Sequence, residues 1–83
     1  MNVIVYLKTG CPWAQAVKDL LSERGIQFEE RDILTSDSYR REVEEKSGQS
    51  KSPTLDIDGT ILPDAGVEDV ETYLEQARGA AKQ

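Results

Sequence analysis

The sequence predicts a compact α/β fold with a four-stranded mixed sheet and three helices. Strand-like and helix-like stretches follow one another in the order β-α-β-α-β-β-α. The first strand, helix and strand fit within about 30 residues, which favours a parallel pair joined by a right-handed crossover. Near the other end, Asp58-Gly59 lies between two short apolar runs and predicts an antiparallel hairpin. The length of 83 residues suits one domain, residues 1–83.

The first unit begins with "NVIVYL" (2–7), a β-branched and aromatic run that reads as a strand buried on both faces. A helix is expected from Pro12 to about Gly25, because proline suits a first helical position and glycine a helix end. Its apolar residues recur at helical spacing: Trp13, Ala16, Val17, Leu20 and Leu21. Residues 26–34, "IQFEERDIL", alternate loosely and predict the second strand.

The second half supplies the remaining elements. Residues 35–48 begin with capping residues and end in Gly48, which predicts an exposed helix with Tyr39 and Val43 on its thin apolar stripe. Residues 53–62 predict the hairpin. Residues 66–79 predict the last helix, with Gly79 as its end.

Composition excludes several classes of function. Sixteen carboxylates against ten lysines and arginines give a net charge of −6, which disfavours nucleic acids and anionic membranes as partners. The first apolar run has only five residues, Val3 to Leu7, so we expect neither a signal peptide nor a membrane helix. A single cysteine rules out a disulfide within the chain and fits a reducing compartment, with the cytoplasm as the default. Without histidine, Cys-His catalysis and the usual metal sites are excluded, so no metal ligand is assigned.

Cys11 is the candidate for chemistry. It lies in the turn before the first predicted helix, where backbone N–H groups are unpaired and the helix dipole is positive. Both effects stabilise a thiolate and lower its pKa, and Lys8 adds a positive charge nearby. A lone cysteine is also commonly a buried, inert hydrophobe, and the local pattern by itself leaves the two readings about equal.

A series of motifs in order resembles the glutaredoxin family over residues 2–79: "KTGCPWA", "SGQSKSPT", "IDGTI" and "AGVEDV". The resemblance implies a thioredoxin-like fold, with Cys11 as the nucleophilic cysteine and Trp13 at the family's aromatic position. It also implies that Pro53 is a cis-proline facing the thiol and that Ser52 pairs with a bound thiol peptide. Lys8 and Gln49 match positions that hold the glycyl carboxylate of glutathione, and Glu68 and Asp69 match the site for its γ-glutamyl end. The alternatives are that Lys8 and Gln49 are ordinary surface residues and that Trp13 belongs to the core. Glu68 and Asp69 can equally be first-turn acids that complement the helix dipole.

The sequence departs from the family pattern at Ala14, which replaces the second cysteine of Cys-Pro-Tyr-Cys. The resemblance therefore implies a monothiol mechanism, with glutathione as co-substrate and glutathionylated proteins or small disulfides as partners of a monomer. Two alternatives stay open: a carrier of a [2Fe–2S] cluster as a glutathione-bridged dimer, and a binding module without redox turnover. Further departures are about two extra residues before "AGVEDV", Lys51 as an added carboxylate contact, and Asp56 in a strand that is usually apolar.

Overall fold

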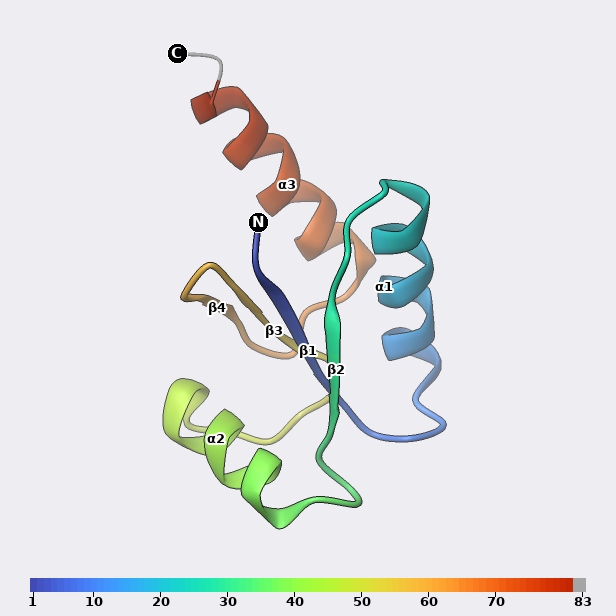
Figure 1. The fold of residues 1–83 in the computed structure, drawn as a ribbon, viewed down its shortest axis with the longest axis vertical. Helices are drawn as coiled ribbons and strands as arrows, with labels where there is room; N and C mark the ends of the chain where they lie inside the picture. The colour runs from blue at the N-terminus through green and yellow to red at the C-terminus, as the bar shows by residue number, and fades with distance from the viewer. Residues whose placement is uncertain (82–83) are drawn as a thin grey trace.

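The fold is a four-stranded sheet with helices on both faces (Figure 1), described by a computed structural model over residues 1–81. Its elements in chain order are β1 (Val3–Leu7), α1 (Pro12–Glu23), β2 (Glu29–Asp32), α2 (Asp37–Ser47), β3 (Thr54–Ile57), β4 (Thr60–Leu62) and α3 (Val67–Ala81). The strand order is β2-β1-β3-β4. β1 and β2 are parallel, whereas β3 is antiparallel to both β1 and β4. The predicted mixed sheet, with its parallel pair and its hairpin, is confirmed.

Side chains of β1 alternate between two separate apolar clusters. Val3, Val5 and Leu7 join the larger cluster, which also contains buried residues of α1 and α3. Tyr6 joins the smaller cluster with Ile33 and with Val43 of α2. This alternation follows from the twofold repeat of a strand, and it places α1 and α3 on one face of the sheet and α2 on the other. The first strand is thus covered on both faces, as its unbroken apolar run predicts.

Two predicted boundaries are wrong. β2 is shorter than the predicted 26–34, because the backbone N–H of Ile26 donates to the carbonyl of Leu21 (2.9 Å) and holds this residue in the turn that ends α1. Ile26 and Phe28 nevertheless pack against the larger cluster. The last helix runs through Gly79 to Ala81. A glycine costs only about 1 kcal/mol inside a helix, and the alanines that follow favour its continuation.

The caps of α2 follow the prediction from sequence. Ser36 is the N-cap and accepts a hydrogen bond from the backbone N–H of Tyr39 (3.3 Å). Gly48 ends the helix in the left-handed conformation (φ +74°), which glycine adopts without steric cost. Gly48 thus fixes where the segment that leads to Pro53 leaves the helix. Of the helices described in residues 1–81, none is long and apolar enough to cross a membrane.

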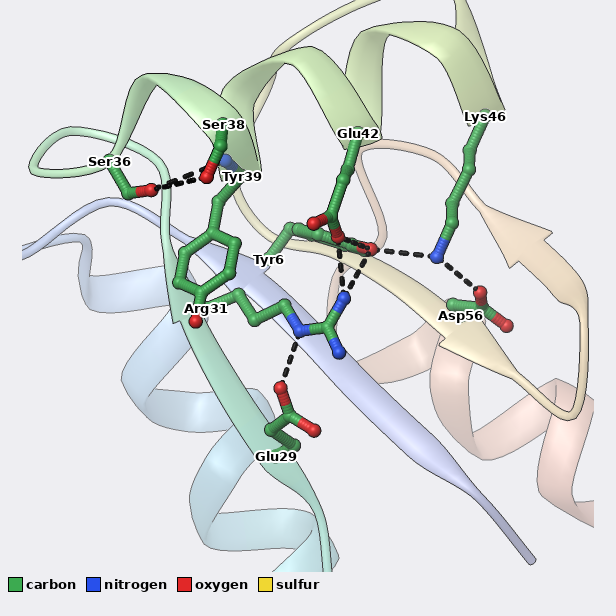
Figure 2. Close-up of polar contacts among 9 residues, drawn as sticks. All are labelled: Tyr6, Glu29, Arg31, Ser36, Ser38, Tyr39, Glu42, Lys46 and Asp56. Carbon is green, nitrogen blue, oxygen red and sulfur yellow. Dashed lines mark hydrogen bonds and ion pairs between the residues drawn. The ribbon is translucent and has the colours of Figure 1, made fainter.

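A polar network attaches α2 to the sheet (Figure 2). Its centre is the hydroxyl of Tyr6, a fully buried residue of β1. This hydroxyl donates to Glu42 Oε1 (2.9 Å) and accepts from Lys46 Nζ (2.7 Å), both on α2. The same Lys46 ammonium contacts Asp56 Oδ2 of β3 at 2.8 Å. The sequence departure at Asp56 is therefore matched by a cation on the facing helix.

Arg31 of β2 extends this network on the other side of Tyr6. Its guanidinium contacts Glu42 of α2 and Glu29 of its own strand, and it donates to the Tyr6 hydroxyl at 3.3 Å. The guanidinium also lies over the rings of Tyr6 and Tyr39, at 5.8 and 5.5 Å from their centres. α2 carries a single buried residue, Val43, so these polar contacts supply much of what holds it in place.

Candidate active site

Cys11 lies where β1 turns into α1. The turn passes through Gly10 at φ +86°, a conformation that favours glycine, and closes with a hydrogen bond from Cys11 N–H to the Lys8 carbonyl (3.0 Å). Cys11 is the N-cap of α1, and its carbonyl accepts the first helical bond from Gln15 N–H (3.1 Å). Pro12 occupies the first helical position, as predicted. The sulfur is thus placed at the positive end of the helix and is half-buried.

The surroundings of the thiol lower its pKa. Partial burial alone would raise the pKa of Cys11, but the Ser52 hydroxyl, the backbone N–H groups of Ala14 and Trp13, and the charge of Lys8 outweigh it. Each of these groups favours the thiolate over the thiol. The hypothesis that Cys11 is a reactive thiol is therefore favoured over the hypothesis that it is an inert, buried one.

Ser52 and Pro53 form the opposite wall of the site. The Ser52–Pro53 peptide bond is cis, as the resemblance implies. The Ser52 hydroxyl accepts a hydrogen bond from Lys8 N–H (3.0 Å), and the Cys11 thiol lies 3.7 Å from the Ser52 carbonyl oxygen. These contacts join two distant segments of the sequence, because Lys8 and Ser52 are 44 positions apart. The Ser52 hydroxyl also interacts with the sulfur of Cys11.

A pocket of about 490 Å³ opens beside Cys11. Its wall contains predicted site residues and several more: Lys8, Cys11, Trp13, Lys51, Ser52, Pro53, Asp64, Ala65 and Gly66. Trp13 is 67% exposed, although it occupies an apolar position of the helical pattern. An exposed indole beside a nucleophile offers an apolar surface to a ligand rather than to the core. Ala14, one position further along α1, is buried at 2% exposure.

Three of the predicted glutathione contacts do not line this pocket. The amide of Gln49 donates to Ser47 Oγ (2.7 Å) and Thr54 Oγ1 (3.1 Å), so it organises its own loop. Asp69 accepts a hydrogen bond from Gly66 N–H (3.0 Å), the bond of a capping box at the start of α3. Glu68 lies in the first turn of the same helix. For Gln49, Glu68 and Asp69, glutathione binding stays a prediction.

The sequence did not assign Asp64 to the site. It lies in the loop before α3, where about two extra residues are expected from the sequence, and its carboxylate lies 4.0 Å from the ammonium of Lys51. The extra length expected for this loop was the available signal, but it did not show which way the carboxylate would face. For Lys51, the sequence does predict an added carboxylate contact, because a cation stands close before the proline.

Comparison with known proteins gives the family. A family model described as glutaredoxin matches residues 3–62. The chain is 35% identical over 78 residues to glutaredoxin 3 of Escherichia coli (strain K12), covering 94% of this chain and 89% of that protein. The chain belongs to the glutaredoxin family. Its class is accordingly that of the thiol–disulfide oxidoreductases.

Solved glutaredoxin structures share the fold. The solution structure of glutaredoxin from Brucella melitensis has a TM-score of 0.70 and 27% identity, covering 98% of this chain and 86% of that one. A crystal structure of a buckwheat glutaredoxin–glutathione complex has a TM-score of 0.71 and 20% identity, covering 90% of this chain and 69% of that one. The thioredoxin-like architecture expected from the sequence is confirmed.

No observation favours the cluster-carrier alternative. Among the residues that the structure describes, no group of three or more cysteine, aspartate or glutamate side chains could hold a metal ion. Each chain has one cysteine, so a [2Fe–2S] cluster would need thiolates from a second chain and from glutathione. This alternative stays a prediction.

Proposed function

We propose that this glutaredoxin is a glutathione-dependent oxidoreductase that works by a monothiol mechanism. The observation that carries the proposal is a half-buried Cys11 at the N-cap of α1, with a lowered pKa and with the buried Ala14 in place of a second thiol. A thiolate is the nucleophile in disulfide exchange, and a low pKa also makes it a good leaving group.

The reaction takes two exchange steps. In the first, the Cys11 thiolate attacks the glutathionyl sulfur of a mixed disulfide, the S–S bond breaks, and the substrate leaves as a thiolate that takes up a proton. In the second, a glutathione thiolate attacks the sulfur of the glutathionyl group on Cys11. Oxidised glutathione leaves and the Cys11 thiolate is restored. The substrate is reduced by two electrons and two glutathione units are joined, so no other oxidant or reductant is needed.

The pocket suits the chemistry of this co-substrate. Glutathione has two carboxylates and one ammonium group, and the pocket wall carries the ammonium groups of Lys8 and Lys51 and the carboxylate of Asp64. The glutathione-bound state of the buckwheat structural neighbour supports the same co-substrate for this chain. We propose further that the protein acts as a monomer in the cytoplasm, where glutathione is kept largely reduced.

Mass spectrometry tests the proposal. Incubation with oxidised glutathione should add one glutathionyl group to the wild-type protein, and reduced glutathione should remove it. The variant Cys11→Ser should form no adduct and should not turn over a glutathionylated peptide. Absence of the adduct on wild type, with Cys11 still accessible to alkylation, would favour the binding module without redox turnover.

A further inference from the structure

Lys51 and Asp64 face one another across the wall of the active-site pocket. The Lys51 ammonium and the Asp64 carboxylate are 4.0 Å apart, and their side chains are 70% and 56% exposed. An ion pair with this separation and exposure is weak. A ligand that offers each group a better partner can therefore separate the two.

The backbone that carries Asp64 is fixed to the wall around Pro53. Asp64 N–H donates to Oγ1 of the buried Thr54 (3.3 Å), and the N–H of the next residue, Ala65, donates to the Pro53 carbonyl (2.8 Å). Asp64 adopts a left-handed backbone conformation with φ +48°, which aspartate and asparagine tolerate better than most residues. The carboxylate thus projects from an anchored loop rather than from a free one.

Asp64 is the acidic side chain that lines this pocket in the described part of the chain. The acids at the start of α3 lie outside the lining, and Asp69 is engaged with Gly66 N–H. An ammonium group bound in this pocket therefore has the Asp64 carboxylate as its anionic partner. The Lys51 ammonium lies beside the Asp64 carboxylate. A ligand whose ammonium and carboxylate groups share one carbon atom can therefore place its ammonium at Asp64 and its carboxylate at Lys51.

We propose that Lys51 and Asp64 bind the zwitterionic amino-acid group of the γ-glutamyl end of glutathione. Lys51 contacts the α-carboxylate and Asp64 contacts the α-ammonium, while Lys8 remains for the carboxylate at the glycyl end. The pair determines specificity, because a thiol that lacks either charge leaves one of the two residues without its partner. This inference rests on the proposed function and assigns the ammonium contact to Asp64 instead of Glu68 and Asp69.

Three disulfides test the assignment, each reacted once with the Cys11 thiolate so that one S–S bond forms, one breaks and one thiolate leaves. They are glutathione disulfide, the glutaryl-cysteinyl-glycine disulfide that lacks the ammonium, and the analogue whose γ-glutamyl α-carboxylate is an amide. Asp64→Asn should slow the reactions of the two ammonium-bearing disulfides roughly three- to fivefold and leave the glutaryl disulfide within about twofold. Lys51→Gln should slow glutathione disulfide and the glutaryl disulfide by a similar factor and leave the amide analogue within about twofold.

Controls separate recognition from reactivity and folding. Alkylation by iodoacetamide, which is uncharged, normalises each rate for thiolate reactivity, and circular dichroism checks the fold. Asparagine is chosen because it tolerates the backbone of residue 64. Glu23→Gln removes a negative charge at the far end of α1 and should change no rate.

The outcomes distinguish the two proposals. If both pocket variants slow all three disulfides equally, or slow none, the assignment of Lys51 and Asp64 is overturned while glutathione use stands. If wild-type Cys11 alkylates but reacts with none of the disulfides, the proposed function fails and this assignment fails with it.

Discussion

Replacing Tyr6 by phenylalanine tests how far the polar network stabilises α2 against the sheet. The change removes one buried hydroxyl and keeps the ring. Three hydrogen bonds are lost: to Glu42 (2.9 Å), from Lys46 (2.7 Å) and from Arg31 (3.3 Å). All three partners are charged, and a hydrogen bond to a charged group contributes about 1.5–3 kcal/mol.

The net cost should be smaller than the sum of three such bonds. Lys46 keeps Asp56 at 2.8 Å, and Arg31 keeps its contacts with Glu29 and Glu42. The Lys46, Arg31 and Glu42 side chains are 32%, 22% and 37% exposed, so water can take the place of the lost hydroxyl. We therefore expect Tyr6→Phe to lower the free energy of unfolding by about 1–2 kcal/mol. For a domain of this size, that corresponds to a fall in Tm of roughly 5–12 °C.

Urea denaturation followed by circular dichroism measures this loss, with Tyr39→Phe as the matched control. Tyr39 lies on the same face of the sheet, under the same guanidinium, and its hydroxyl has no hydrogen bond among the described residues. The control should lose less than about 0.5 kcal/mol. Equal losses in the two variants, or a loss below about 0.5 kcal/mol for Tyr6→Phe, would refute the central role given to this hydroxyl. Alkylation of Cys11 should be unchanged, because the thiol lies against the larger cluster on the other face.

Three further predictions concern the site and its support. Ser52→Ala should raise the pKa of Cys11, because the hydroxyl favours the thiolate, and the pH dependence of iodoacetamide alkylation measures the change; Ser52→Thr should restore the wild-type profile. Lys8→Glu should slow adduct formation with glutathione disulfide about fivefold relative to alkylation at the same pH, and equal slowing of both reactions would refute the contact. Burial raises the pKa of Asp56, but Lys46 and the N–H of Gly59 outweigh it and hold the pKa below its ordinary value. The unfolded chain therefore binds this proton first, and the stability from Asp56 is present above a pH of about 4 and is lost as the pH falls through the lowered pKa. Asp56→Asn should lose less stability than wild type over that acidic range in urea titrations, and an unchanged acid profile would contradict the assignment.

Local features of the sequence determined the elements and the place of the thiol. These features act over only a few residues, so they can be recognised from the sequence alone. They are the helical spacing, Pro12 at the start of α1, Gly48 at the end of α2 and the turn at Asp58-Gly59. The position of Cys11 at a helix N-terminus follows from the same short range, and so do the N–H groups and the Lys8 charge that lower its pKa. The Ser52 hydroxyl, which also lowers this pKa, comes from a distant segment.

The tertiary structure alone decided which polar groups meet. Gln49 and Asp69 had the right chemistry for glutathione, but nearby hydroxyl and backbone groups engage them. Asp64 lines the pocket because its loop is hydrogen-bonded to Thr54 and Pro53. Asp56 forms an ion pair with Lys46 on the facing helix. A polar side chain has many possible partners, and its choice depends on segments that chain crossovers bring together from distant parts of the sequence. The spacing of apolar residues predicts which face of a helix or strand is buried, but it does not predict which distant polar groups will pair.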